Sequence, residues 1–270
     1  MKFICPKCRE KLIEENSRAV CKNGHSYDKA RGGYYNLLMS SRGGVHGDNK
    51  EMVLARRAFL SAGYYAPLAR YLAFQVMEYT PPCGAVLDAG AGEGYYTDFI
   101  ERTLRERDGE SHISAFDISK DAVREIGKKN PRISLAVAGS YHMPVADGSF
   151  DCVVNTFSPM ALEETSRVLK AGGHFIMVIP GEMHLFGLKQ AIYETPYKNI
   201  VADTALEGFE LIEDEPLNYK VKLDSKEDIR SLFMMTPYAY RTRAEDREKI
   251  LSLEALETEI DFRVFVYKKL

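Results

Sequence analysis

The sequence predicts an α/β protein whose main sheet is mostly parallel with an antiparallel last strand, joined to a small N-terminal metal-binding module. A Cys/His cluster lies within the first 25 residues, and strand-like apolar runs alternate with helical patterns from residue 85 onward. With 270 residues and 45% hydrophobic content, the chain can form one large domain and a smaller module. We expect the module over 1–39, a linker and helical prelude over 40–80, and the α/β body over 81–270.

Charge is distributed unevenly along the chain. The formal net charge is −3, yet residues 1–50 hold ten Lys/Arg against five Asp/Glu. A basic module on an acidic body suits a protein that grips nucleic acid at one end, and it equally suits a small solvated domain. No apolar run approaches the ~18 residues of a membrane span, and the first residues do not read as a signal peptide. We therefore expect a cytoplasmic protein without a membrane segment.

Four potential metal ligands lie in two pairs near the N-terminus. A Cys-x-x-Cys pair and a Cys-x-x-x-His pair, twelve residues apart, comprise Cys5, Cys8, Cys21 and His25. Three thiolates and one imidazole suit tetrahedral zinc, and a site with four protein ligands is usually structural. A redox Cys-x-x-Cys would leave Cys21 and His25 without a role, and a disulfide framework is uncommon in a cytosolic chain. Zinc would supply the folding energy that so short a module lacks.

Two helices are predicted between the module and the sheet, over 50–60 and 68–77, after a polar, glycine-rich linker. The apolar positions of the first helix that we expect to face the core are Met52, Leu54, Ala55, Ala58 and Phe59. Arg56 and Arg57 are then expected to face outward. Tyr65, at the break between the two helices, is either a lid over the ligand site or an ordinary aromatic at a helix junction.

A glycine-rich segment follows the first predicted strand of the body, 85–88. Its three glycines at alternate positions, which allow a tight turn and close approach of a ligand, are Gly90, Gly92 and Gly94. A helix predicted from Tyr95 places that ligand at a helix N-terminus. The spacing differs from the dinucleotide fingerprint, and Asp88 could bind an ammonium rather than a pyrophosphate. The segment resembles the cofactor motif of class I S-adenosylmethionine-dependent methyltransferases; a nicotinamide site and a purely structural glycine turn are the alternatives.

The second and third strands of the body are predicted over 112–117 and 132–137. Asp117 ends the second strand, where a carboxylate can accept hydrogen bonds from both hydroxyls of a ribose. Ser119 is expected to cap the next helix. Methyltransferases of this class commonly carry an aspartate for the adenine amine at the position of Gly139, so here we expect adenine to be held by backbone groups and the nearby Tyr141.

The last strands are predicted over 151–156, 174–179, 209–223 and 260–267, the final one antiparallel. Residues 169–173 are expected to reverse the chain into the strand at 174, a feature that resembles the fifth-strand hairpin of class I methyltransferases. Asn155 and His184 follow strand ends at the ligand-binding edge of the sheet. His184 is either a pocket residue or a structural histidine. The aromatic and basic turn at 234–241 could meet a base or only pack.

In this order, the Cys/His module and the motifs at 55–60, 92–97, 180–185 and 235–237 resemble the bacterial 23S rRNA guanine-N1 methyltransferases, including the branch linked to resistance to tylosin-type macrolides. The resemblance covers nearly the whole chain. It implies a Rossmann-like class I sheet, S-adenosylmethionine as cofactor, and one structural zinc in a module that grips RNA. It also implies a hairpin loop of 23S rRNA as substrate and a homodimer as a further state.

These arguments and the resemblance together indicate two sets of site residues. The cofactor set is Tyr65, Asp88, Gly90, Gly92, Glu93, Gly94, Asp117, Ile118, Ser140, Tyr141, Asn155 and His184. The RNA set is Arg56, Arg57, Tyr238 and Arg241.

The catalytic residue is not identified by the sequence. Guanine N1 carries a proton at neutral pH, so the reaction needs a base or a pocket that favours the anion. His184, Glu93 and Asp147 are reachable bases, and none of them is assigned. Two other functions stay open: a methyltransferase acting on a small molecule, and a zinc-containing RNA-binding protein without catalysis.

Overall fold

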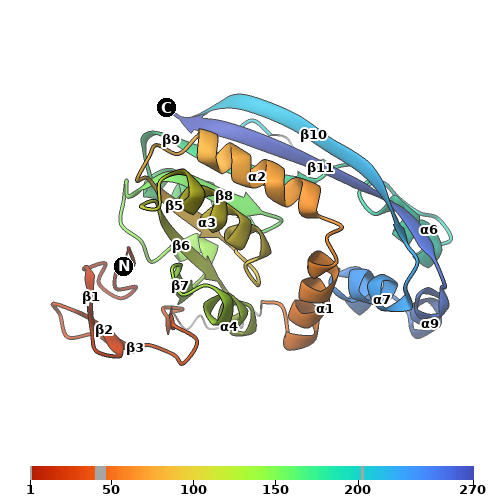
Figure 1. Ribbon diagram of the computed structural model, residues 1–270, viewed down its shortest axis with the longest axis horizontal. Helices are drawn as coiled ribbons and strands as arrows, with labels where there is room; N and C mark the ends of the chain where they lie inside the picture. The colour runs from red at the N-terminus through yellow and green to blue at the C-terminus, as the bar shows by residue number, and fades with distance from the viewer. Residues whose placement is uncertain (1, 40–46, 202–203) are drawn as a thin grey trace.

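The computed structural model describes residues 2–39, 47–201 and 204–270, and within them the main sheet has eight strands in the order β10-β11-β9-β8-β5-β6-β7-β4 (Figure 1). The strands are β4 (Tyr34–Asn36), β5 (Ala85–Ala89), β6 (His112–Asp117), β7 (Ser134–Val137), β8 (Phe150–Thr156), β9 (Leu169–Pro180), β10 (Phe209–Leu223) and β11 (Leu256–Lys269). Neighbours from β4 to β9 pair in parallel, whereas β11 pairs antiparallel with both β9 and β10. The predicted mostly parallel sheet with an antiparallel last strand is confirmed.

The two faces of the sheet are covered by different parts of the chain. The helices are α1 (Lys50–Ser61), α2 (Ala66–Glu78), α3 (Tyr95–Arg107), α4 (Lys120–Lys129), α5 (Leu162–Val168), α6 (Phe186–Ile192), α7 (Lys226–Met234), α8 (Tyr238–Arg241), α9 (Ala244–Ser252) and the 3-10 helix η1 (Ser140–His142). One hydrophobic core joins alternate strand residues to α1–α4, α6, α7 and α9. A second core, on the other face, joins the intervening strand residues to α5 and the N-terminal module.

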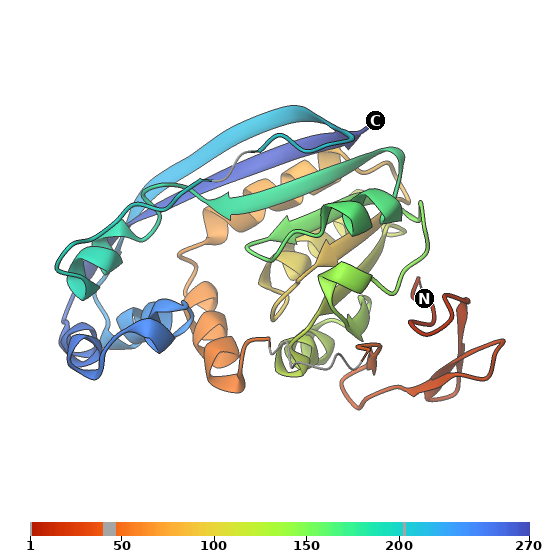
Figure 2. The ribbon, with the colours of Figure 1, turned by 180° about the vertical axis from the view of Figure 1, so that it is seen from behind.

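The N-terminal module is a small antiparallel sheet of β1 (Leu12–Glu15), β2 (Arg18–Cys21) and β3 (Ser26–Asp28), which lies at one end of the molecule in both views (Figures 1 and 2). Gly24, between two of the ligands, has φ +81° and donates to the carbonyl of Cys21, so the chain turns tightly there. The turn is what allows Cys21 and His25 to aim at one ion.

Most body elements lie where the sequence predicts them. β6 and β10 have the predicted bounds, α3 begins at Tyr95, and the Ser119 side chain caps α4 by accepting from the Ala122 amide. β7 begins at Ser134, two residues after its predicted start, and β11 begins at Leu256, four residues before.

One strand prediction needs correction, and one strand is missing from the predictions. The reversal expected at 169–173 is wrong, because Leu169 already pairs with Phe150 and the strand continues through an irregular stretch until His174 pairs with Cys152. Gly172, with φ +70°, lies in that stretch and accommodates the extra residues. The sequence does not predict β4, because its three residues, which pair in parallel with β7, carry too little local pattern.

The orientation predicted for α1 is also partly wrong. Leu54 is exposed and Ala58 faces solvent, whereas Val53, Phe59 and Leu60 are buried. Helix α1 is therefore rotated relative to the predicted apolar face, and the helix face that carries Arg56 is turned toward the body. Of the expected linker, residues 40–46 lie outside the described part of the chain.

Candidate functional site

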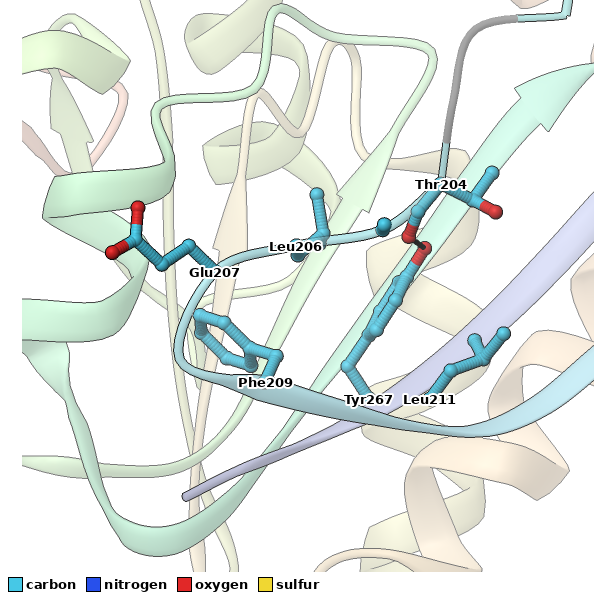
Figure 3. A pocket seen from close by; sticks show the side chains of 7 residues that line it. Thr204, Leu206, Glu207, Phe209, Leu211 and Tyr267 are labelled. Carbon is cyan, nitrogen blue, oxygen red and sulfur yellow. Dashed lines mark hydrogen bonds between the residues drawn. The ribbon is translucent and has the colours of Figure 1, made fainter.

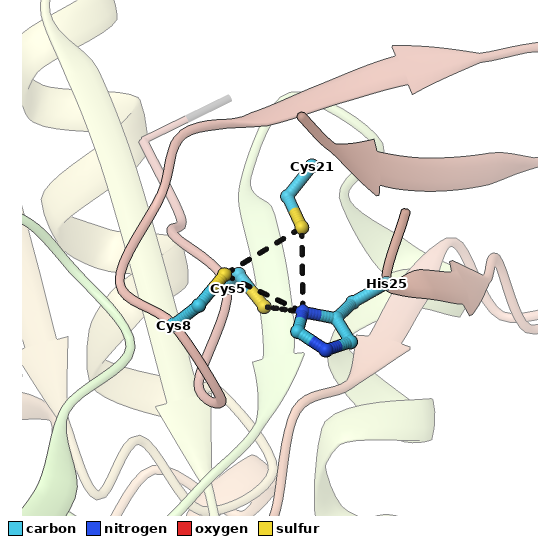
Figure 4. A group of neighbouring side chains, drawn as sticks. All are labelled: Cys5, Cys8, Cys21 and His25. Carbon is cyan, nitrogen blue, oxygen red and sulfur yellow. Dashed lines mark hydrogen bonds between the residues drawn. The ribbon is translucent and has the colours of Figure 1, made fainter. Parts of the chain in front are cut away.

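The four N-terminal Cys/His ligand atoms converge on one point (Figure 4). The three sulfurs and His25 Nδ1 all lie within 4.8 Å of one another. Nδ1 is 3.4 Å from the sulfurs of Cys5 and Cys8 and 3.5 Å from that of Cys21. One imidazole nitrogen has a single proton or a single lone pair, so these contacts cannot be three hydrogen bonds. They are the spacing of four ligands around a shared cation.

The separations fit zinc. Around a tetrahedral ion with Zn–S of about 2.3 Å and Zn–N of about 2.05 Å, two sulfurs lie roughly 3.8 Å apart and a sulfur and a nitrogen roughly 3.6 Å apart. Cys8 and Cys21 have sulfurs 3.7 Å apart, close to this value. Tyr27 Oη lies 3.3 Å from Cys5 Sγ and can donate to that thiolate, which supports the ligand from outside the first shell of the ion. The module therefore holds a complete structural zinc site.

Direct contacts fix the zinc module to the body. Phe3, 1% exposed, forms a β-bridge with Val145. Arg9 pairs with Asp147 at 2.7 Å, and Arg167 pairs with the same carboxylate at 2.7 Å. The hydrogen bond from Arg167 is the main cause that lowers the pKa of Asp147. The structure thus gives Asp147, one of the bases considered from sequence, a role in docking the module.

The glycine-rich loop connects β5 to α3 and packs tightly against the turn that follows β8. Gly90 has φ +89°, and a Cβ built there would lie 2.0 Å from Ser158 Oγ. The amides of Gly90 and Ala91 both donate to the carbonyl of Phe116, which fixes the loop to the end of β6. A Cβ built on Gly92 would come no closer than 3.9 Å to another residue's atoms, so the middle of the loop is open to a ligand.

Two carboxylates are held at the base of this loop. Asp88, 2% exposed, accepts from Thr97 Oγ1 at 2.6 Å, and burial raises the pKa of Asp88 to about 7. Asp117 accepts from the amides of Gly92 (2.9 Å) and Ser119 (2.7 Å). Burial raises the pKa of Asp117, and the two amides oppose that rise by favouring the carboxylate. Asp117 therefore joins the glycine loop to the N-terminus of α4.

Arg56 lies over the loop, contrary to the prediction that it faces outward. Its guanidinium forms an ion pair with Asp48 and donates to the Met235 carbonyl at 3.3 Å. One guanidinium nitrogen is the atom found 3.9 Å from the position of a Gly92 Cβ. Desolvation lowers the pKa of Arg56, but Asp48 and Glu93 outweigh it and the net shift is upward. Arg56 therefore remains charged at this position.

The other predicted RNA contacts lie outside this loop. Arg57 pairs with Glu125 on α4 at 2.6 Å. Tyr238 on α8 is half-buried, with its ring 6.3 Å from that of Tyr193, whereas Arg241 is exposed.

An aromatic cluster lies at the carboxyl ends of β8 and β9. The Phe157 ring is parallel to that of His184 (9° between planes, centroids 6.5 Å apart) and its centroid is 5.1 Å from that of Phe262. Tyr65 is 3% exposed, and its hydroxyl lies 3.3 Å from His184 Nε2. The structure therefore places Tyr65 beneath the cluster. A ring this deeply buried does not act as a lid over the ligand site.

His184 is held as a neutral ring. The Asp261 amide donates to its Nδ1 at 3.4 Å, so the proton is assigned to Nε2, which points at Tyr65. Burial lowers the pKa of His184 to about 3. Because both nitrogens are engaged and protonation is disfavoured, His184 is a poor base at neutral pH.

Phe157 was not included among the site residues predicted from sequence. Phe157 is 42% exposed although it lies beside the aromatic cluster, and its φ is +55°, which is strained for a bulky residue. The Phe157 amide donates to the Val178 carbonyl at 3.1 Å, and Asn155 Nδ2 bonds the carbonyls of Ala89 and Pro159. These bonds hold the strained turn. The sequence feature that could have identified Phe157 is its position as an aromatic residue directly after a strand, at the ligand-binding edge.

The remaining predicted cofactor residues lie at the ends of β6 and β7. Ile118 is half-buried directly after Asp117, Ser140 begins η1, and Tyr141 is exposed. The Ala138 amide donates to the Asp117 carbonyl at 3.0 Å, which keeps these two strand ends together. The structure thus gathers these residues on one edge.

Two further observations concern the rest of the surface. A recess outside this edge is formed by the segment before β10, the start of β10 and the end of β11, including Leu206, Phe209 and Tyr267 (Figure 3). None of the predicted site residues lines it. Among the described residues, the helices are too short or too polar to cross a bilayer.

Comparison with known proteins finds one family model for the N-terminal module and one for the first part of the body. Residues 3–40 match the family described as "RlmA, N-terminal", a zinc ribbon, and residues 86–173 match "Methyltransferase domain". A 23S rRNA (guanine(748)-N(1))-methyltransferase of Streptomyces fradiae is 34% identical, covering 82% of this chain and 79% of that protein. Proteins of Micromonospora griseorubida (33% identical; 88% and 86% covered) and Bacillus subtilis (28%; 99% and 97%) are also named for 23S rRNA guanine-N1 methylation.

Proposed function

Because this chain belongs to the family of 23S rRNA (guanine-N1)-methyltransferases, we propose that it transfers a methyl group from S-adenosylmethionine to N1 of a guanine in 23S rRNA. The observation that supports the proposal is that an open glycine loop, the Asp117 carboxylate and the exposed residue Phe157 all lie at one edge of the main sheet. A hairpin loop as target, a homodimer and a cytoplasmic location belong to the same proposal.

The residues of this edge fit the cofactor. The open middle of the glycine loop admits its methionine end, Asp117 would accept from the ribose hydroxyls, and Ile118 would contact adenine. When bound, S-adenosylmethionine supplies a sulfonium methyl that is already electrophilic, so most of the rate would come from positioning.

Phe157 is the proposed platform for the target base. A guanine in a loop can leave its neighbours at modest cost and stack on an aromatic side chain. The Phe157 ring is exposed, lies on His184 and Phe262, and belongs to the turn whose Ser158 packs against Gly90. A base stacked there would lie beside the glycine loop.

The proposed methyl transfer is a single displacement at the methyl carbon. The bond from guanine N1 to the methyl carbon forms, the bond from that carbon to sulfur breaks, and S-adenosylhomocysteine leaves with the electron pair. The N1 proton is released, so the products are N1-methylguanine, S-adenosylhomocysteine and one proton. We assign no base for this proton. Burial disfavours protonation of His184, and Asp147 is engaged by two arginines. Glu93 is only 3% exposed, and its charge acts on Arg56.

The test is methyl transfer from labelled S-adenosylmethionine to unmethylated 23S rRNA, followed by primer extension. N1-methylguanine cannot form a Watson–Crick pair, so the proposal expects labelled RNA with a stop at one guanine. A stop at guanine 748 would match the position in the name of the Streptomyces fradiae relative. Zinc-loaded protein that binds cofactor but gives neither label nor stop would contradict the proposal and favour a small-molecule substrate.

A further inference from the structure

The chain that leaves the zinc module enters the cofactor edge of the main sheet. β4 pairs in parallel with β7, with Asn36 opposite Val137, and the Leu37 amide donates to the Val137 carbonyl at 3.0 Å. β7 itself pairs in parallel with β6, whose last residue is Asp117. Leu38 therefore emerges at the same carboxyl edge at which the ribose is proposed to bind.

Leu38 lies beside the position that lacks an adenine-binding carboxylate. Its Cδ1 is 3.9 Å from the place where a Cβ of Gly139 would be, an ordinary van der Waals distance. Gly139 precedes Ser140 and Tyr141, which belong to the proposed cofactor set. An aliphatic side chain from the zinc module's chain thus borders the site where a polar contact to adenine is missing.

The apolar side chains at this edge are left open to solvent. Leu38 is 42% exposed, Met39 51% and Tyr141 65%. Neighbouring exposed large apolar groups next to polar ligand-binding groups are typical of a surface that a ligand covers. Adenine is a flat ring with two largely apolar faces, and it has the size and chemistry to cover them.

We propose that Leu38, together with Ile118 and Tyr141, forms the apolar wall of the adenine subsite, so that the zinc module's chain contributes directly to cofactor binding. The wall takes the place of the aspartate absent at Gly139 and holds adenine by contact area instead of a charged hydrogen bond. This inference rests on the proposed use of S-adenosylmethionine.

The experiment measures the dissociation constants of S-adenosylhomocysteine and adenosine by calorimetry, using the full-length zinc-loaded protein. Leu38→Ala removes the contact and is expected to weaken both ligands by about tenfold, since it uncovers roughly one aliphatic side chain's worth of buried area. Leu38→Met preserves an apolar contact and is expected to stay within about twofold of the unchanged protein.

Ile13→Ala is the matched control, because Ile13 is also an exposed aliphatic residue of the zinc module, 57% exposed on β1. It is expected to leave both dissociation constants unchanged. Zinc content and thermal midpoint, measured on every variant, identify any loss that comes from a misfolded module. Unchanged binding in a folded Leu38→Ala variant, or an equal loss in Ile13→Ala, would overturn the inference. Failure of the unchanged protein to bind S-adenosylhomocysteine would instead overturn the proposed function.

Discussion

The zinc module and the α/β body reach a defined structure by different means. The body buries alternate strand residues on both faces of its sheet. On one face these residues form a hydrophobic core with the helices that cover it. The module has three short strands, and its buried residues Phe3, Leu12 and Ala19 belong to the core on the other face of the body's sheet. The module is held together by metal ligands, whereas the body is held together by packed apolar side chains.

This difference indicates that the module depends on the body as well as on zinc. Val145 and Phe150 of the body share a core with Phe3 and Cys5 of the module. Loss of zinc would therefore uncover part of the sheet. The following predictions test this contrast, in order of expected effect.

Removal of a zinc ligand should have the largest effect. Cys21→Ser is expected to abolish zinc binding and unfold the module, because structural zinc contributes about 10–16 kcal/mol of apparent binding free energy in small modules. Mass spectrometry measures the zinc content, and hydrogen exchange of residues 2–36 measures the unfolding of the module. The matched control is Cys83→Ser, since Cys83 is an exposed thiol of the body. Protected module amides in the Cys21→Ser variant would contradict the dependence on zinc.

Gly90→Ala should have the next largest effect, and it acts within the body. The new Cβ would lie 2.0 Å from Ser158 Oγ, so the loop or the turn after β8 must move and cofactor binding should weaken by more than about tenfold. Gly148→Ala shares the strained backbone, with φ +54°, but meets open space. It should cost only about 1 kcal/mol of stability, with cofactor affinity retained. Calorimetric titration and thermal melting distinguish the two, and equal cofactor affinities would show that the close packing of Gly90 is unimportant.

Asp88 should make the stability of the body depend on pH. Burial raises its pKa in the folded protein to about 7, above the value of about 4 expected when unfolded. The folded state then binds the proton more tightly, so this contribution is fully present below about pH 4 and is lost as the pH rises to about 7. Urea unfolding at pH 5 and pH 8 should show a larger loss of stability in the wild type than in Asp88→Asn. Parallel losses in the two proteins would contradict the assignment.

Arg9→Ala should have the smallest effect. The Arg9–Asp147 pair joins the two regions, but its side chains are 54% and 72% exposed and Arg167 continues to hold Asp147. The expected loss is below about 1 kcal/mol in urea unfolding, and it should shrink further in high salt. A loss of several kcal/mol would mean that this surface pair, rather than the shared core, attaches the module.

The sequence was sufficient for features that depend on local pattern. The zinc ligands, β6, the Ser119 cap and the start of α3 follow from spacing and periodicity over a few residues. The comparison with relatives and the parallel sheet confirm the fold, the cofactor class and the zinc. The role of each site residue stays a prediction, although the structure brings most of the cofactor set to one edge.

What the sequence missed depends on contacts between distant segments. The hydrophobic pattern of α1 alone predicts an outer face for Arg56, whereas Asp48 and the Met235 carbonyl hold it over the glycine loop. β4 joins the main sheet through pairing with β7, a segment about 100 residues later in the chain, and Phe157 lies beside His184 and Phe262, which come from other strands and loops. No local pattern encodes such partners.

The most direct test of the account identifies the product nucleoside. Unmethylated 23S rRNA would be incubated with zinc-loaded protein and S-adenosylmethionine carrying an isotopically labelled methyl group, then digested to nucleosides and separated by mass spectrometry. The account predicts the label in N1-methylguanosine alone. Label in another methylated nucleoside, or none from protein that binds both zinc and the cofactor, would contradict it.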